Sequence, residues 1–260
     1  MIERHLLAVA LLATGSALAQ PSDPGLYLFR IPTSAPADTL QVQDELLRVD
    51  LTVRDPESLL ARLSATSVVA AVMDEQHVQI TVGPHETLRA EPAAAHRAAS
   101  FVIDFDQEPV VHMLDALVDA HGTEPAIDVL VDHVHAEVRR KSYRRGFDLA
   151  SQVARSREGD CTEHAVLLAA LSRASGYPAR VVLGILMMSS RDRLLAFGHA
   201  WTVIYQGSHW QIADATRPDL ELRDVQVRYV PVMELADEGP GYGLALLDMA
   251  TLYPQRVAVR

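Results

Sequence analysis

An unbroken apolar run at residues 165–171 constrains the fold of this chain more than any other feature. The run follows Asp160 and Glu163, whose spacing is typical of a capping box at the start of a helix, and Gly176 marks the end of that helix. A helix that is apolar on every side has to be covered by other elements on every side. The sequence therefore predicts a domain built around one buried helix that begins at Cys161.

Cys161 is the only cysteine of the 260 residues, and it occupies the first position of the predicted helix. Backbone N–H groups without helical partners and the positive end of the helix dipole favour the nucleophilic thiolate at such a position. The same N–H groups can hold a developing oxyanion. A buried apolar thiol without a chemical role is the alternative interpretation.

The first 19 residues have the features of a signal peptide. Arg4 and His5 precede an apolar run at residues 6–13, and small residues at 17–19 form a cleavage site. A membrane anchor or a buried helix is the alternative, although the run is too short to span a bilayer. We expect a mature protein in the periplasm or outside the cell, with no membrane contact. Structural cysteines form pairs in that oxidising environment, so a lone cysteine indicates chemistry.

The net charge of −11 limits the partners of the protein. Nucleic acids and anionic membrane surfaces repel such a chain on average, so neither is an expected partner. The basic residues between 139 and 145 are interpreted as a solvated helix end, where positive charges complement the helix dipole.

Two patterned regions are separated by a stretch rich in Ala and Pro at residues 89–100. In the first region, alternating apolar residues at 46–53 and 78–82 predict strands, and residues 56–63 predict a short helix. In the second, an apolar stripe at residues 127–138 predicts another helix. We expect three parts, which are a signal peptide at 1–19, a small α/β region of unknown role at 20–99, and a larger domain at 100–260.

A hairpin is predicted downstream of the buried helix. Residues 199–205 and 208–214 have the strand pattern, and a tight turn at residues 206–207 joins them. In that register His199 lies opposite Asp214, with the two Cβ atoms about 5 Å apart. A four-residue loop would shift the pairing by two but keep both residues on one face. The histidine thus gains an orienting carboxylate.

Four sequence blocks resemble the transglutaminase-like core of bacteria. They are Gly-Asp-Cys-Thr-Glu-His-Ala from position 159, Gly-Tyr-Pro-Ala-Arg-Val-Val from 176, His-Ala-Trp from 199 and Asp-Ala-Thr from 214. The resemblance covers residues 120–217 and implies a papain-like α+β fold in which the cysteine helix packs against an antiparallel sheet. It implies that Cys161 is the nucleophile, that His199 is the general base and then acid, and that Asp214 fixes the imidazole.

The resemblance also implies a protein or peptide substrate, attacked at a backbone or side-chain amide to form a thioester. No cofactor and no metal are expected. The backbone N–H of Cys161 is the first candidate for an oxyanion donor, and the side chains of Gln152 and Tyr143 are second candidates that are equally interpretable as packed residues. Animal transglutaminases have a tryptophan upstream of the cysteine, whereas both tryptophans of this chain lie downstream.

Several alternatives remain open on the sequence. Superfamily members include amine-transferring enzymes as well as cysteine proteases and amidases, and the sequence favours hydrolysis because it shows no barrel domains of the animal type. A surface loop expected at residues 187–197 would decide whether water or an amine accepts the acyl group. Cys161, His164 and His199 could instead bind zinc. A non-catalytic module that binds peptide or cell wall on the same fold is the alternative from another class.

Overall fold

The computed structural model describes most of the chain beyond residue 29. The described residues are 30–34, 46–83, 88–142, 147–190, 193–216, 226–237, 239, 242 and 244–259. The signal peptide predicted at 1–19 lies outside them.

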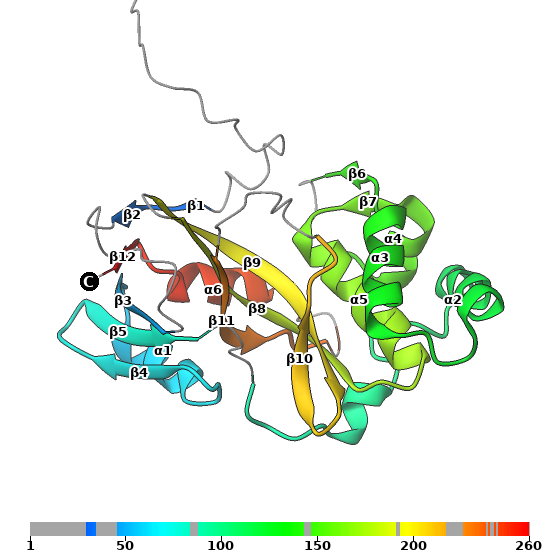
Figure 1. Cartoon of the computed structure of the whole chain (residues 1–260), viewed down its shortest axis with the longest axis horizontal. Helices are drawn as coiled ribbons and strands as arrows, with labels where there is room; N and C mark the ends of the chain where they lie inside the picture. Colours follow the sequence, from blue (N-terminus) through cyan, green and yellow to red (C-terminus); the bar gives the residue numbers. More distant parts are fainter. Residues whose placement is uncertain are drawn as a thin grey trace, which may run out of the picture.

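A five-stranded antiparallel sheet forms the centre of the protein (Figure 1). Its strands follow the order β1, β9, β8 and β11, and β10 also pairs with β9. Their bounds are Arg30–Ile31 for β1, Ala179–Ser190 for β8, Arg193–Gln206 for β9, His209–Ala213 for β10 and Gln226–Glu234 for β11. The long hairpin of β8 and β9 is therefore held by other strands on both of its outer edges.

Helix α5 (Cys161–Ala174) packs on β8 and β9, and its residues 162–173 are all buried. Three helices cover its other sides, namely α2 (Glu108–His121), α3 (Ile127–Glu137) and α4 (Ala150–Ser156). A short parallel pair, β6 (Arg140–Lys141) with β7 (Glu158–Gly159), leads into its first turn. The predicted α+β fold, with the cysteine helix packed on an antiparallel sheet, is confirmed.

A second sheet combines the N-terminal region with the C-terminal strand. Its order is β2, β12, β3, β5 and β4, with bounds Thr33–Ser34, Arg256–Val259, Leu47–Thr52, His77–Val82 and Val69–Val72. Helix α1 (Pro56–Leu63) connects β3 to β4, and the apolar residues of β3 alternate into the core as predicted. A 3-10 helix, η2 (Ala94–Arg97), follows this region. Helix α6 (Ala245–Leu252) leads into β12, so the chain returns to its N-terminal region at its end.

The hairpin of β9 and β10 turns one residue later than predicted. Gln206 pairs with His209, and Gly207 and Ser208 have φ angles of 60° and 71°, which is typical of a type I′ turn. A turn of this type needs two consecutive residues with a positive φ. Glycine commonly adopts such an angle but serine rarely does, so Ser208 was not expected in the turn. The pairing therefore shifts by two positions, and Asp214 follows the last residue of β10.

The prediction of a surface loop at residues 187–197 is also wrong. These residues belong to β8 and β9, apart from 191–192, which the structure does not describe. Met187, Leu194 and Ala196 are buried. Because β11 pairs with β8 and β1 with β9 along this stretch, the apolar residues become part of the sheet instead of a loop.

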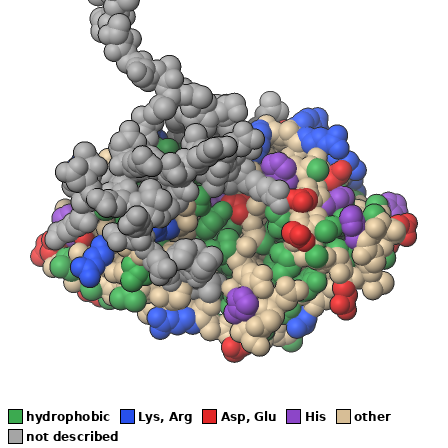
Figure 2. All heavy atoms as spheres, viewed as in Figure 1, with side chains coloured by type: hydrophobic (Ala, Val, Ile, Leu, Met, Phe, Trp, Pro, Cys, Tyr) green, Lys and Arg blue, Asp and Glu red, His purple; other side chains and the backbone are tan. Residues whose placement is uncertain are grey.

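Charged and apolar side chains intermix on the face shown in Figure 2. Basic side chains gather there at the end of the molecule where β6 lies in Figure 1. Arg139 and Arg140 are exposed and lie 3.6 Å from carboxylate oxygens of Glu137 and Glu158, as expected for a solvated surface. No helix in the described ranges is long and apolar enough to cross a membrane.

Candidate active site

The first turn of α5 leaves one backbone N–H group available, and it belongs to Cys161. Oδ1 of Asp160 accepts from the N–H of Thr162 at 2.9 Å, and the predicted capping box satisfies the N–H of Glu163. Glu163 in turn accepts from the N–H of Asp160 at 2.8 Å, and His164 N–H donates to the Asp160 carbonyl at 3.1 Å. Within the described residues, the N–H of Cys161 is the donor of this turn that has no partner.

His199 lies where one edge of the central sheet is open. On that edge β1 pairs with residues 196–197 of β9 and β10 pairs with residues 202–206. Between them, residues 198–201 carry no strand in the described part of the chain. The histidine is 3% exposed, and its ring stacks on Trp201 with the ring centroids 6.1 Å apart. The imidazole is therefore fixed in place while its edge of the sheet remains reachable by other segments.

Three side chains are brought together at the site. Nε2 of His199 lies 2.8 Å from Oδ2 of Asp214. Cys161 is near enough to the His199 side chain to favour its charged form. Because Nε2 faces the carboxylate, Nδ1 is the ring nitrogen that is available to the thiol. The structure thus brings together the three residues that the sequence selected, although the hairpin register differs from the prediction.

The carboxylate of Asp214 has hydrogen-bond donors on both oxygens. Oδ1 accepts from the backbone N–H and the hydroxyl of Thr216 at 2.9 and 2.5 Å, and Oδ2 also accepts from the Tyr229 hydroxyl at 2.8 Å. Burial opposes the charged form, but the attraction of His199 and these hydrogen bonds outweigh it and lower the pKa of Asp214. The carboxylate is therefore held charged and oriented.

The same pairing favours the charged form of the imidazole. Burial acts to lower the pKa of His199, but the charge of Asp214, the hydrogen bond to it and the nearby Cys161 raise it above its ordinary value. An imidazolium beside a thiol stabilises the thiolate by charge attraction. The arrangement is suited to nucleophilic attack by sulfur followed by proton delivery from the ring.

Two tyrosines that the sequence interpretation did not select also belong to the site. Tyr229 comes from β11 and donates to Asp214. Tyr253 follows α6, and a Cβ built on Gly198 would lie 2.5 Å from both its Cζ and its Oη. Gly198, directly before the histidine, was the available signal, because a glycine inside a strand indicates the close approach of another group.

The second candidates for oxyanion donors are not among these contacts. Gln152 is exposed on α4. Tyr143 lies outside the described residues. Their predicted role stays a prediction, whereas the N–H of Cys161 has the freedom that an oxyanion donor requires.

Two buried ionisable residues, Glu163 and His164, follow Cys161 in the first turn of α5. Burial, followed by the nearby charge of Asp160, raises the pKa of Glu163 to about 7. Burial lowers the pKa of His164 to about 4, and its Nδ1 lies 2.6 Å from the Asp160 carbonyl. Hydrogen bonds with the backbone thus engage both side chains in the packing of the first turn. In the described ranges no group of three or more His, Cys, Asp or Glu side chains is arranged to hold a metal ion.

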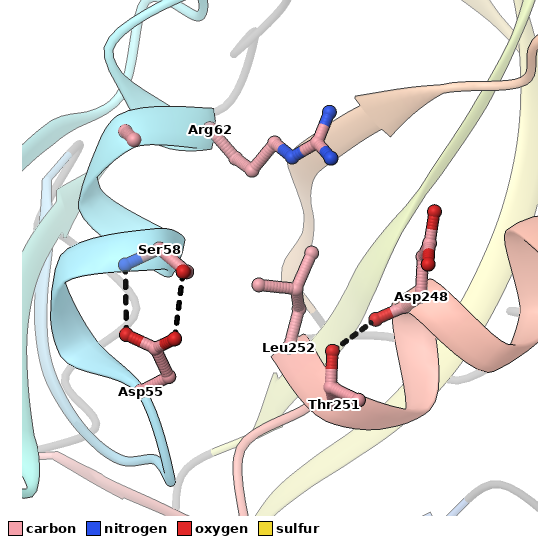
Figure 3. A pocket seen from close by; sticks show the side chains of 7 residues that line it. Asp55, Ser58, Arg62, Asp248, Thr251 and Leu252 are labelled. Carbon is pink, nitrogen blue, oxygen red and sulfur yellow. Dashed lines mark hydrogen bonds between the residues drawn. The ribbon is translucent and has the colours of Figure 1, made fainter.

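A polar cavity of about 230 Å³ lies away from these residues, between α1 and α6 (Figure 3). Arg62 of α1 and Asp248 of α6 face it from opposite sides. Cys161, His199 and Asp214 do not line it. This cavity is therefore separate from the candidate active site.

Residues 118–215 match the family described as the transglutaminase-like superfamily, which confirms the resemblance expected over residues 120–217. The chain is also similar to a Cytophaga hutchinsonii protein provisionally assigned as a cysteine protease, with 15% identity, a TM-score of 0.43, and coverage of 74% of this chain and 82% of that chain. It is similar to the periplasmic domain of TgpA from Pseudomonas aeruginosa, with 17% identity, a TM-score of 0.42, and coverage of 73% and 75%. No curated protein matches the chain at a significant level.

Proposed function

Because the chain contains a domain of the transglutaminase-like superfamily, we propose that it is a thiol enzyme that acts on peptide or side-chain amides through Cys161. The observation that carries this proposal is the meeting of Cys161 with the hydrogen-bonded pair His199 and Asp214, at a helix start whose Cys161 N–H has no partner among the described residues. A thiol, a base and an orienting carboxylate in contact constitute an activated nucleophile.

The first half of the reaction forms a thioester. His199 takes the thiol proton of Cys161, and the sulfur attacks the carbonyl carbon, so that a C–S bond forms and the carbonyl oxygen becomes negative. The backbone N–H of Cys161 donates to that oxygen. When the oxygen re-forms its double bond, the C–N bond breaks and His199 gives its proton to the departing amine.

The second half regenerates the enzyme. Water or an amine attacks the thioester carbon, and His199 removes a proton from the attacking molecule. The C–S bond then breaks and the thiolate leaves. Asp214 stays charged throughout and holds the imidazole with one nitrogen toward the sulfur. Hydrolysis is the favoured outcome because Cys161 is partly exposed, which gives water access to the thioester.

The protein is further proposed to act in the periplasm or outside the cell after removal of residues 1–19. The composition of that segment supports export, as does the single unpaired thiol. Intact-mass measurement of the protein from an exporting host tests this point. We expect the mature chain to begin near Gln20.

Mass spectrometry of a glutamine-containing protein substrate tests the activity. The substrate is incubated with the enzyme, with and without a primary amine, beside the Cys161→Ala variant. Cleavage or deamidation that the variant lacks indicates a cysteine hydrolase, and amine incorporation that the variant lacks indicates a transglutaminase. If substrate modification persists unchanged in Cys161→Ala, the nucleophile assignment is wrong.

A non-catalytic binding module on the same fold makes a different prediction for the thiol. The hydrogen bond from His199 to Asp214 favours the enzyme, because a binding role does not require an oriented imidazole near sulfur. Iodoacetamide should therefore alkylate Cys161 faster than a free model thiol at neutral pH. Alkylation no faster than the model thiol would favour the binding module.

A further inference from the structure

Tyr253 reaches the candidate site from the far end of the chain. Its N–H donates to the Met249 carbonyl at 2.8 Å, which continues the hydrogen bonding of α6. Two residues later, the N–H of Gln255 donates to the Thr52 carbonyl at 2.7 Å, where β12 begins to pair with β3. The tyrosine is thus held from both sides by the second sheet and by α6. Its backbone is therefore anchored outside the segment that carries the motif.

The ring of Tyr253 covers the open edge of β9 at the site. Any side chain at position 198 would collide with Cζ and Oη of the tyrosine, so only glycine leaves room for the hydroxyl beside His199. The hydroxyl lies against the backbone directly before His199, and the charge of Cys161 acts on its pKa. Tyr253 and Cys161 are both partly exposed, whereas His199 is buried. The tyrosine and the thiol can therefore each be approached from solvent.

The proposed reaction needs such a donor. When sulfur attacks a carbonyl, the carbonyl oxygen becomes an oxyanion, which acyl-transfer enzymes hold with two or more aligned donors. The free N–H of Cys161 supplies one of these donors. Trp201 Nε1 also lacks a hydrogen-bond partner in the described part of the chain, but it is fully buried in the sheet. Gln152 is exposed on α4 and has no described contact with the thiol. The Tyr253 hydroxyl lies against Gly198, next to His199, on a partly exposed residue, and it is the side-chain donor that the described contacts place beside the triad.

We propose that Tyr253 is a catalytic residue that donates a hydrogen bond to the oxyanion formed when Cys161 attacks an amide carbonyl. This inference rests on the proposed thioester chemistry. The attack forms the C–S bond and moves the carbonyl π electrons onto oxygen, where the Tyr253 hydroxyl and the Cys161 N–H meet the charge. The phenol keeps its proton, and collapse of the oxyanion expels the amine, which is protonated by His199.

The protonation state of the phenol supports this role. Burial and the charge of Cys161 raise the pKa of Tyr253, and they outweigh the opposing interaction with the His199 backbone. This shift favours the protonated hydroxyl, which is the form that donates a hydrogen bond.

Two probes of different chemistry separate this role from simple packing. p-Nitrophenyl acetate acylates a thiolate through an oxyanion, whereas iodoacetamide alkylates it by displacement and forms none. Both rates are measured on the full chain of the wild type, Tyr253→Phe and Tyr242→Phe. Tyr242 is a matched control because it is also a partly buried tyrosine, but its ring packs against Phe101.

We expect Tyr253→Phe to lower the p-nitrophenyl acetate rate by about 10²-fold and to leave the iodoacetamide rate unchanged, as for loss of one oxyanion donor. Tyr242→Phe should change neither rate. Equal loss of both rates in Tyr253→Phe, or loss of neither, would overturn the assignment of Tyr253 alone. A wild type that reacts with both probes no faster than a free model thiol would instead refute the proposed function together with it.

Discussion

The segment that carries the motif and the segments that follow it contribute different groups to the site. Residues 161–214 supply the thiol, the imidazole and the carboxylate. Tyr229 and Tyr253 supply hydroxyl groups, and they come from β11 and from the end of α6, beyond the family match at 118–215. The groups proposed to react thus lie in short sequence blocks of one segment. The hydroxyl groups around them come from segments distant in sequence, which strand pairing brings to the site.

The largest expected effect concerns the carboxylate of the motif. Asp214→Asn should lower turnover by about 10⁴-fold, because the amide cannot balance the imidazolium charge and favours the wrong tautomer. Turnover of the glutamine-containing protein is measured beside Asp115→Asn, a change at an exposed position of α2. If Asp214→Asn keeps more than about a tenth of the activity, the triad assignment fails at this residue.

Gly198→Ala tests whether the motif segment depends on the C-terminal segment. The added methyl group would lie 2.5 Å from Oη of Tyr253 and has to displace the ring. We expect a fall of about 10²-fold in the p-nitrophenyl acetate rate, comparable to that of Tyr253→Phe. In the double variant the two losses should not add, because one displaced donor cannot be lost twice. Full additivity would show that Gly198 acts independently of the tyrosine.

Tyr229→Phe tests the support of the carboxylate from β11. Tyr229 donates to the same oxygen of Asp214 that faces His199, so its loss should lower turnover by about tenfold, as for a hydrogen bond to a charged group. The pKa of Asp214 should rise toward its ordinary value, which moves the acid limb of the pH–rate profile to higher pH. Tyr177→Phe is the control, because that hydroxyl donates to the Pro125 carbonyl. An unmoved acid limb would contradict a positioning role.

Glu163 differs from Tyr229 and Tyr253, because it lies inside the motif but has a structural role. The folded protein raises its pKa from the ordinary 4.5 to about 7, so the protonated carboxyl is favoured by folding. Its contribution to stability is complete below pH 4.5 and is lost as the pH rises toward 7. The wild type should therefore lose up to about 3 kcal/mol of unfolding free energy relative to Glu163→Gln across this interval.

Urea unfolding at pH 4.5 and pH 7 measures this difference for Glu163→Gln and for the exposed control Glu75→Gln. The control should follow the wild type at both pH values. A wild type and a Glu163→Gln variant with parallel pH dependence would show that the buried carboxyl is not neutralised on folding.

Local signals in the sequence were enough to predict the centre of the site. The capping box and the apolar run placed Cys161 at the start of a buried helix, and strand alternation placed His199 and Asp214 on one hairpin. The turn was misplaced by one residue because Ser208 adopts a positive φ that a serine does not signal. The error left the histidine and carboxylate in contact, since a shift of two keeps both on the same face.

The surroundings of the site could not be predicted because they depend on partners that are distant in sequence. Residues 187–197 contain polar positions that suggest a loop, yet β11 and β1 extend the sheet across them. Strand β12 has four residues and gains its place by pairing with β2 and β3, both more than 200 positions earlier. Tyr253 lies between α6 and this strand, so no local pattern could bring it to Cys161.

The central claim is that Cys161 forms a covalent acyl intermediate, and its direct test is intact-mass spectrometry of acid-quenched enzyme shortly after mixing with p-nitrophenyl acetate. The account predicts one acetyl group per chain, located on Cys161 by peptide mapping, absent from Cys161→Ala and slow to appear in Asp214→Asn. Acetylation that is absent from the wild type, or that appears at the same rate in Cys161→Ala, would contradict it.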